Sequence, residues 1–213
     1  MVIEIIQQGM ISKYKKDIII LGSGGHAVSI LEILYYLKEY KLTGYVDKQL
    51  NKKSKLKFLG NDNDLKLIRT KTTYAIIGIG QIKNSRIREN KFTMLKTLKF
   101  KIPNIISPFA ILSNNISIGE GNSVFHQALI NSECVIGNNN IINSKALIEH
   151  ETTIGNNNHI STGVIINGNC EIGNNNFIGS GVIINNNIKI GNNCIIGSSK
   201  NLKKDIKNNQ IIK

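Results

Sequence analysis

The 213-residue sequence has no run of about 18 consecutive apolar residues, so we predict no helix that crosses a membrane. It also lacks the start of a secreted protein. The opening residues, MVIEIIQQGMISKYKK, have no basic segment followed by a long apolar stretch and a small-residue cleavage site. We therefore expect a cytoplasmic protein that does not insert into membranes.

Cysteine is scarce, and its three positions are Cys134, Cys170 and Cys194. The number is odd and no CxxC pair occurs, so nothing favours a metal-binding or redox motif. We expect three reduced, buried thiols and no metal ion.

Acidic residues are also few, with 14 Asp and Glu against 27 Lys and Arg, which gives a formal net charge of +13. A surplus of positive charge favours binding to nucleic acid, to an anionic membrane surface or to small anionic ligands. The basic residues are scattered, mostly before residue 102, without interleaved aromatic residues. We therefore predict no nucleic-acid partner. A solvated surface explains most of the charge, and nucleotide-type ligands stay open.

The first half of the chain reads as alternating strands and helices. The segment DIIILGSGGHAVSILEILYYLKEY, which starts at Asp17, predicts a strand, a glycine-rich turn and a helix. TGYVD, which ends at Asp47, and TYAIIGIG, residues 73–80, predict two more strands, and a helical stretch follows to about Leu98. We predict a small parallel α/β sheet over residues 17–102, after a lead-in of unassigned role at residues 1–16.

Beyond Pro103 an apolar residue recurs at every sixth position without exception. These positions are Ile106, Leu112, Ile118, Val124, Ile130, Ile136, Ile142, Ile148, Ile154, Ile160, Ile166, Ile172, Ile178, Ile184, Ile190, Ile196 and Leu202. Glycine also recurs every eighteen residues, at Gly119, Gly137, Gly155, Gly173 and Gly191. Three six-residue units therefore form one turn, and residues 103–213 are predicted to form a parallel β-helix of about five coils.

A second set of residues lies four positions after the ladder residues and is predicted to point inward. Asn122, Asn140, Asn158 and Asn176 form one row, which Cys194 continues, and Cys134 and Cys170 lie in another. We expect the asparagine amides to form hydrogen bonds from coil to coil.

The segment LIEHETT interrupts this nearly uncharged ladder. His150 lies beside a predicted corner between Glu149 and Glu151, and the ladder does not require a histidine there. Adjacent carboxylates can orient an imidazole and raise its basicity. His126 has no acidic neighbour in the sequence and is expected to be a solvated corner residue. The spacing of His126, His150 and His159 does not follow the eighteen-residue repeat, which argues against a zinc site.

The turn LGSGGHA contains G-x-G-x-x-A, with Gly22, Gly24 and Ala27, and Asp47 follows a couple of dozen residues later. Taken alone, this suits a Rossmann-like dinucleotide fold and an NAD-dependent oxidoreductase. The domain is short for a complete two-halved dinucleotide sheet, however, and nothing indicates a hydride acceptor site.

The segments GSGGH, GYVD, AIIGIGQIKNSRIR and INSKALIEHETTIGNNNHIS resemble, in order and spacing, one group of the hexapeptide-repeat acyltransferases. These sugar acetyltransferases join a small nucleotide-binding domain to a left-handed β-helix. Members include the UDP-4-amino-sugar N-acetyltransferase of bacillosamine synthesis and the sialic acid O-acetyltransferase. The resemblance implies a left-handed coil and a homotrimer with acetyl-CoA at a subunit boundary.

The resemblance also implies roles for single residues. His150 would be the catalytic base and Glu151 the acid that polarises it. Acetyl-CoA would contact His159, Gly168 and Ser180. Gly24, Gly25 and His26 would hold the diphosphate of the sugar nucleotide, while Asp47 and Gly78 help hold the nucleoside and neighbouring groups. Lys48 is also expected to contact the substrate. It stands where many members carry a second acid, which leaves the identity of the nucleotide open.

The expected function is acetyl-CoA-dependent N-acetylation of a nucleotide-linked amino sugar, such as a UDP-4-amino-4,6-dideoxy sugar, for surface glycan assembly. Imidazole suits proton removal from the attacking amine, and direct transfer needs no covalent intermediate. O-acetylation of sialic acid or a related sugar is the alternative. In the family a C-terminal tail closes over the coenzyme, and the C-terminal residues of this sequence depart from that tail. A trimer that binds sugar nucleotides but does not catalyse transfer is therefore a third hypothesis.

Overall fold

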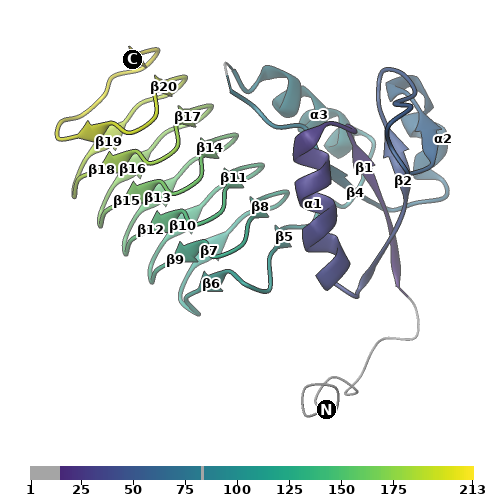
Figure 1. Cartoon of the computed structure of the whole chain (residues 1–213), viewed down its shortest axis with the longest axis horizontal. Coiled ribbons are helices and arrows are strands. Elements are labelled where there is room, and N and C mark those ends of the chain that lie inside the picture. The colour runs from purple at the N-terminus through teal and green to yellow at the C-terminus, as the bar shows by residue number, and fades with distance from the viewer. Residues whose placement is uncertain (1–14, 83) are drawn as a thin grey trace, which may run out of the picture.

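The computed structural model describes residues 15–82 and 84–213, and it combines a small α/β sheet with a long stack of coils (Figure 1). Residues 1–14, most of the predicted lead-in, lie outside the described residues, and Lys16 begins the first strand. Among the described residues no helix has the length and apolar character needed to cross a membrane.

The N-terminal sheet has four parallel strands in the order β3-β2-β1-β4. They are β1 (Lys16–Leu21), β2 (Tyr40–Val46), β3 (Phe58–Gly60) and β4 (Tyr74–Ile77), accompanied by α1 (Gly25–Tyr36), α2 (Leu65–Arg69), α3 (Arg86–Thr97) and the 3₁₀ helix η1 (Asp62–Asp64). The three predicted strands and both longer helices are present. Strand β3 and helix α2 were not predicted, because three and five residues are too few to show a periodic pattern.

Both faces of this sheet are buried, which explains the unbroken apolar run of β1. Ile18 and Ile20 pack with α1, while Ile19 and Leu21 pack in a separate cluster with Leu95 of α3. A strand that alternates between two cores needs apolar residues at every position.

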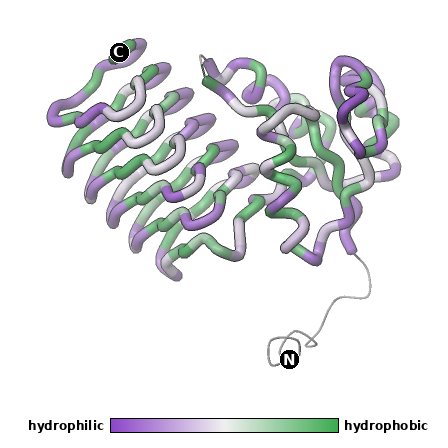
Figure 2. Tube along the Cα trace, in the orientation of Figure 1, coloured by the Kyte–Doolittle hydropathy of each residue, from purple (hydrophilic) through white to green (hydrophobic). Residues whose placement is uncertain are grey.

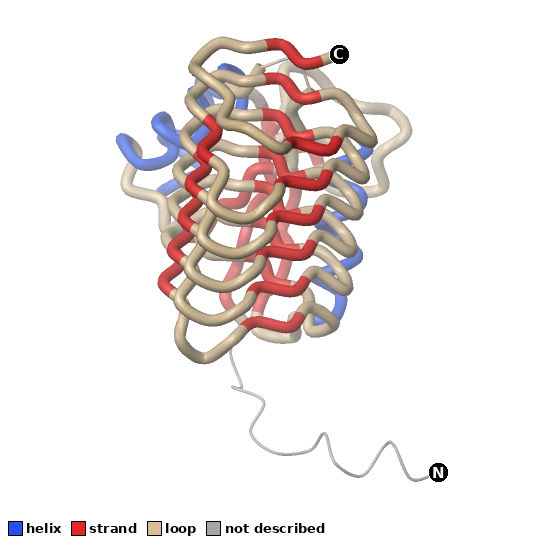
Figure 3. The backbone as a smooth tube through the Cα atoms, turned by 90° about the vertical axis from the view of Figure 1, so that its left-hand side faces the viewer, coloured by secondary structure: helices blue, strands red, loops and turns tan. Residues whose placement is uncertain are grey.

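The C-terminal part is a left-handed β-helix whose two-residue strands stack into three parallel sheets (Figure 3). The first sheet contains β5 (Ile105–Ile106), β8 (Ser123–Val124), β11 (Ile141–Ile142), β14 (His159–Ile160), β17 (Phe177–Ile178), β20 (Ile195–Ile196) and β22 (Ile211–Ile212). The second contains β6 (Ile111–Leu112), β9 (Leu129–Ile130), β12 (Leu147–Ile148), β15 (Ile165–Ile166), β18 (Ile183–Ile184) and β21 (Asn201–Leu202). The third contains β7 (Ser117–Ile118), β10 (Val135–Ile136), β13 (Thr153–Ile154), β16 (Glu171–Ile172) and β19 (Lys189–Ile190).

The predicted six-residue ladder is confirmed strand by strand. Each ladder residue is the second residue of its strand and points inward, as with Ile148, Ile160 and Ile166, which are fully buried. Figure 2 shows the resulting apolar segments recurring in every coil. A six-residue unit is thus a two-residue strand followed by a corner.

The buried asparagine row is also confirmed. The side-chain oxygen of Asn140 accepts the backbone N–H of Asn158 at 2.8 Å, and its amide donates to the backbone oxygen of Gly155 at 2.9 Å. Asn122, Asn158 and Asn176 bond in the same pattern, and the row ends where Cys194 donates its N–H to Asn176. All three cysteines are free and buried, as predicted.

Many corners require a left-handed backbone, which explains the abundance of asparagine. Asn139, Asn157, Asn175 and Asn193 have φ between 56° and 62° in successive coils. Asparagine adopts this conformation more readily than most residues with a Cβ atom. The corner geometry therefore selects residue type outside the apolar ladder.

The N-terminal domain packs on the first sheet of the β-helix. Phe125 and Ile141 lie in the same cluster as Ile20 and Ile30 of the N-terminal domain. Across the boundary, the Gln81 side chain donates to the backbone oxygen of Asn157 at 2.8 Å. The first sheet is therefore covered by the same chain, while the corner joining the second and third sheets lies on the far side of the coil.

The asparagine row generates a stability prediction. Asn158→Ala removes the acceptor for the N–H of Asn176 and the amide that donates to Asn140 and Gly173. Because these groups stay buried without partners, we expect the free energy of unfolding to fall by about 3 kcal/mol. Urea unfolding would measure it. The exposed Asn201→Ala is the control, and equal effects of the two substitutions would contradict a structural role for the row.

Candidate active site

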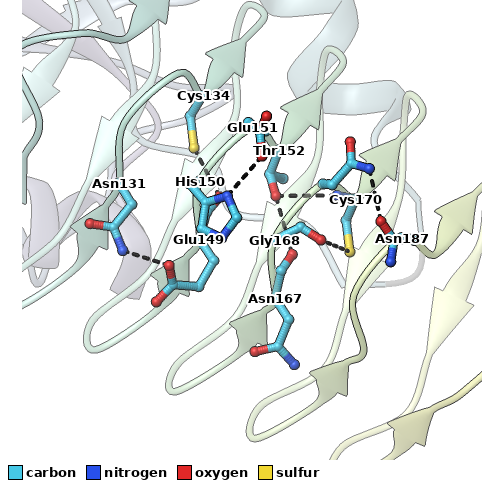
Figure 4. Close-up of polar contacts among 11 residues, drawn as sticks. Asn131, Cys134, Glu149, His150, Glu151, Thr152, Asn167, Gly168, Cys170 and Asn187 are labelled. Atoms are coloured by element: carbon cyan, nitrogen blue, oxygen red, sulfur yellow. Dashed lines mark hydrogen bonds and ion pairs between the residues drawn. The ribbon is translucent and has the colours of Figure 1, made fainter.

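The histidine predicted as a base lies at the corner between β12 and β13, on the side of the coil away from the N-terminal domain (Figures 1 and 4). Its Nδ1 atom is 2.9 Å from a carboxylate oxygen of Glu151. Both side chains are more than half exposed. A carboxylate accepts hydrogen bonds, so the bond favours the proton on Nδ1 and leaves the Nε2 lone pair outward. That is the arrangement a general base requires.

The two acids beside His150 are held differently. Glu149 accepts a hydrogen bond from the Asn131 amide one coil earlier, at 2.8 Å, whereas Glu151 bonds the imidazole (Figure 4). Glu151 has φ 59°, and the next two coils carry Asn169 and Asn187 at this corner, with φ 56° and 63°. Glutamate adopts this conformation less readily than asparagine, so the corner geometry alone does not explain Glu151.

Gly168, predicted to line acetyl-CoA, lies directly next to the imidazole in the following coil. A Cβ atom there would be 2.7 Å from both Cε1 and Nε2 of His150. Glycine at this corner is therefore required by the close approach of the ring. The structure brings together His150, Glu151 and Gly168, but places Ser180 at another corner, between β17 and β18.

The predicted nucleotide site is a hollow of about 500 Å³ at the N-terminus of α1. Gly24 and Gly25 lie there with open space where a Cβ atom would point. Asp47 accepts a hydrogen bond from the Ser23 hydroxyl at 2.6 Å, and the Asn51 amide donates to the backbone oxygen of Ser23 at 3.0 Å. The network fixes the loop after β2 against the glycine turn.

Three lysines line this hollow: Lys48, Lys52 and Lys53. All three are exposed, and no ion pair to them occurs among the residues that the structure describes. Only Lys48 was predicted. The density of lysine directly after Asp47 was the signal that could have identified the other two.

His26 and His159 meet between the two domains. His159 lies on the outer face of the first sheet, with its Nδ1 atom 2.6 Å from the backbone oxygen of Gln81. Burial, the nearby Arg88 and His159 lower the pKa of His26 to about 3, and burial also lowers the pKa of His159. Both rings are therefore neutral at pH 7. Their Nε2 atoms are buried without a hydrogen-bond partner among the described residues.

Gly78 follows the last residue of β4 and lies against α1. A Cβ atom there would be 2.8 Å from Ala27 and 2.7 Å from Ile20, so the residue permits the close approach of α1 to the sheet. Within one chain the predicted residues thus form separate groups. His26 and His159 lie at the domain boundary, Gly24, Asp47 and Lys48 line the hollow, and His150 lies on the opposite side of the β-helix.

His126 lies at a corner, between β8 and β9, as expected, but the expectation of a solvated side chain was wrong. This ring is only partly exposed: its Nδ1 atom is 2.6 Å from the Ser107 hydroxyl, and its Nε2 atom is 3.8 Å from a carboxylate oxygen of Glu32 in α1. Tyr36 and Phe109 pack around it. The acid neighbour comes from the other domain, about ninety residues earlier in the chain, so local sequence could not show it. No group of three or more His, Cys, Asp or Glu residues within 15–82 and 84–213 is arranged to hold a metal ion.

Comparisons with known proteins identify both parts of the chain. Residues 17–95 match the family model of the PglD N-terminal domain, and residues 169–203 match that of the bacterial transferase hexapeptide repeat. No curated protein sequence matches the chain. The predicted resemblance to sugar acetyltransferases that join these two modules is therefore confirmed at the level of the modules.

Solved structures share the complete two-part fold. A histidine-to-asparagine mutant of perosamine N-acetyltransferase from Caulobacter crescentus, in complex with CoA and GDP-perosamine, has a TM-score of 0.87 at 24% identity and covers 92% of each chain. The acetyltransferase domain of PglB from Neisseria gonorrhoeae, in complex with acetyl coenzyme A, has a TM-score of 0.86 at 24% identity, covering 93% of this chain and 96% of that one. WeeI from Acinetobacter baumannii has a TM-score of 0.81 at 19% identity, covering 93% and 97%. The predicted fold class is confirmed.

The contact between Gly168 and His150 generates a structural prediction. In Gly168→Ala the new methyl group overlaps the ring, because carbon atoms in van der Waals contact lie about 3.5–4.0 Å apart. We expect a crystal structure to show the imidazole displaced by about 1 Å or more and its bond to Glu151 broken. Asn186→Ala, at the same corner one coil further, is the control. An unmoved ring in Gly168→Ala would contradict the proposed packing.

Proposed function

We propose that this protein is an acetyl-CoA-dependent N-acetyltransferase that modifies the amino group of a nucleotide-linked amino sugar for surface glycan assembly. The observation that carries the proposal is the His150–Glu151 pair, with an Nε2 lone pair exposed beside Gly168. Relatives of the same fold bind CoA with GDP-perosamine or bind acetyl coenzyme A, which supports both substrates. A cytoplasmic location is part of the proposal.

The transfer would be direct. The sugar amine attacks the thioester carbonyl, and His150 takes the proton from the nitrogen. The C–S bond then breaks, the acetyl group stays on the nitrogen, and the imidazolium gives its proton to the departing thiolate, which leaves as CoA thiol. Glu151 stabilises the imidazolium that forms. A backbone N–H is the candidate to stabilise the oxyanion.

The cysteines make poor nucleophiles for a covalent alternative. All three are buried, and burial raises the pKa of the Cys134 and Cys170 thiols. A higher pKa reduces the thiolate fraction at neutral pH, and the thiolate is the reactive form. A ternary complex of protein, sugar and acetyl-CoA therefore fits the chain better than an acyl-enzyme.

The glycine turn would bind the nucleotide. Backbone N–H groups at the N-terminus of α1 favour phosphate, and Lys48, Lys52 and Lys53 add positive charge to the same hollow. Asp47 lines the same hollow and is a candidate acceptor for polar groups of the nucleoside. Three lysines favour a nucleoside diphosphate over the single phosphate of a CMP-linked sialic acid.

A homotrimer would complete the site. The outward residues of the second sheet form an apolar row, Ile111, Leu129, Leu147, Ile165 and Ile183, whereas those of the third are mostly polar or charged. A continuous apolar row on a β-helix face suits contact with a second copy. Such a contact lies next to the His150 corner. The nucleotide domain of a neighbouring copy would then lie close to this corner, and Gly168 and Ser180 could line the same site for acetyl-CoA.

The experiment measures release of CoA thiol from acetyl-CoA with UDP-, GDP- and dTDP-4-amino sugars. We expect sugar-dependent turnover that His150→Ala reduces by about a hundredfold or more, because the general base is lost. Glu151→Gln should have a smaller effect, and Glu133→Gln, at the same corner one coil earlier, should have none.

The other readings predict different outcomes. Turnover only with sialic acid would favour O-acetylation, and thermal stabilisation by NAD would favour the oxidoreductase. Binding of a sugar nucleotide without any turnover would favour the non-catalytic trimer. Each of these results would overturn the N-acetyltransferase proposal.

A further inference from the structure

Arg88, in the first turn of α3, is the most buried charged side chain that the structure describes. It is 1% exposed. Burial lowers its pKa to about 9, so the guanidinium is still charged at pH 7. No ion pair joins it to a carboxylate among the described residues. A buried charge without a counter-ion is costly, so its bonding partners have to compensate.

The partners are four backbone oxygens from both domains. Nη1 donates to Ile77 at 2.8 Å and to Ile79 at 3.0 Å, on either side of Gly78. Nε donates to Asn139 at 3.3 Å and Nη2 to Gly121 at 3.4 Å, at the corners of two successive coils. The planar fork of arginine can bond all four acceptors at once, which a lysine ammonium cannot reproduce. Arg88 thus ties the end of β4 to the β-helix.

The hydrogen bonds of Arg88 hold the short segment that carries Gln81. Ile79 and Gln81 belong to the same short segment after β4, and Gln81 is 5% exposed between the domains. Its side chain donates to the backbone oxygens of Asn157 and Asn176, while its own backbone oxygen is 2.6 Å from Nδ1 of His159. A carbonyl only accepts, so this bond places the proton on Nδ1 and leaves the His159 Nε2 atom as an acceptor.

We propose that Arg88 is a positioning residue for the acyl-transfer site, and that it holds the Gln81 carbonyl against His159 so that the ring presents its Nε2 lone pair. The inference rests on the proposed function for the role of His159 near acetyl-CoA. Burial and, to a smaller extent, the positive charge of Arg88 lower the pKa of both His159 and His26, which keeps the two rings neutral. Phe177 packs edge-on against the His159 ring and restricts its rotation further.

The test uses the complete protein with ¹⁵N-labelled histidine, since the chain has only four histidines. The nitrogen shifts report which ring atom carries the proton and at what pH the ring titrates. We expect wild-type His159 to be the Nδ1–H form and neutral at pH 7. In Arg88→Gln we expect a mixture of the two neutral forms, because the Gln81 carbonyl is no longer held against Nδ1.

Arg88→Lys separates geometry from charge. Lysine keeps the positive charge but loses the fork, so the two neutral forms should mix in this variant as well. Arg86→Gln is the matched control, because Arg86 is exposed in the same turn of α3, and it should leave His159 unchanged. If Arg88→Gln does not fold, Arg88→Lys alone decides.

Turnover gives a second readout. Acetyl transfer by Arg88→Gln should fall about tenfold or more in kcat, with a smaller loss in Arg88→Lys and none in Arg86→Gln. His159 signals identical to wild type in both folded Arg88 variants would overturn the proposal. An inactive wild type would contradict the proposed acetyltransferase, while the histidine spectra would still decide the role of Arg88.

Discussion

The eighteen-residue register of the coils determines which side chains lie next to one another along the β-helix, including those at the His150 corner. Within the stack, a two-residue strand pairs with the strands eighteen residues before and after it, so its residues are stacked on their counterparts in the neighbouring coils. Only the last pairing, of Ile195 with Ile211, has a different spacing among the described strands of the β-helix. The inward asparagines fix this register with side-chain bonds at the same spacing. A one-residue slip would turn every ladder residue to the outside. The register therefore places residue 168 directly next to the His150 ring, where glycine leaves the space that the ring occupies.

Docking of the N-terminal domain sets the second constraint. Arg88 and Gln81 bond to backbone oxygens of the β-helix, and the apolar residues beside them continue the core of the N-terminal domain into the first sheet. This fixes the nucleotide hollow on the side of the coil away from His150. If both are parts of one active site, neighbouring copies must supply them. Such sharing makes the proposed activity dependent on assembly, and the apolar row of the second sheet is the surface available for it.

Local and repeated patterns were predictable from the sequence, because each repeat gives the same information many times. The ladder, the asparagine row and the buried thiols all follow from spacing. Arg88 shows what could not be predicted. In the polar helix segment RIRENKFTMLKT an arginine reads as a solvent-exposed residue, yet it is buried, because its acceptors come from other elements, including corners 33 and 51 residues away. Glu32 beside His126 was missed for the same reason.

Co-expressed variants test whether one site combines His150 of one copy with the glycine turn of another. His150→Ala removes the base, and Gly25→Glu puts a negative charge in the open space at the N-terminus of α1, where the phosphates would bind. Each variant alone should be inactive. In randomly mixed trimers about a quarter of the subunit boundaries combine an intact base with an intact turn, so about a quarter of the wild-type turnover should return. No recovery in mixed trimers, with both variants folded, would contradict a site shared between copies.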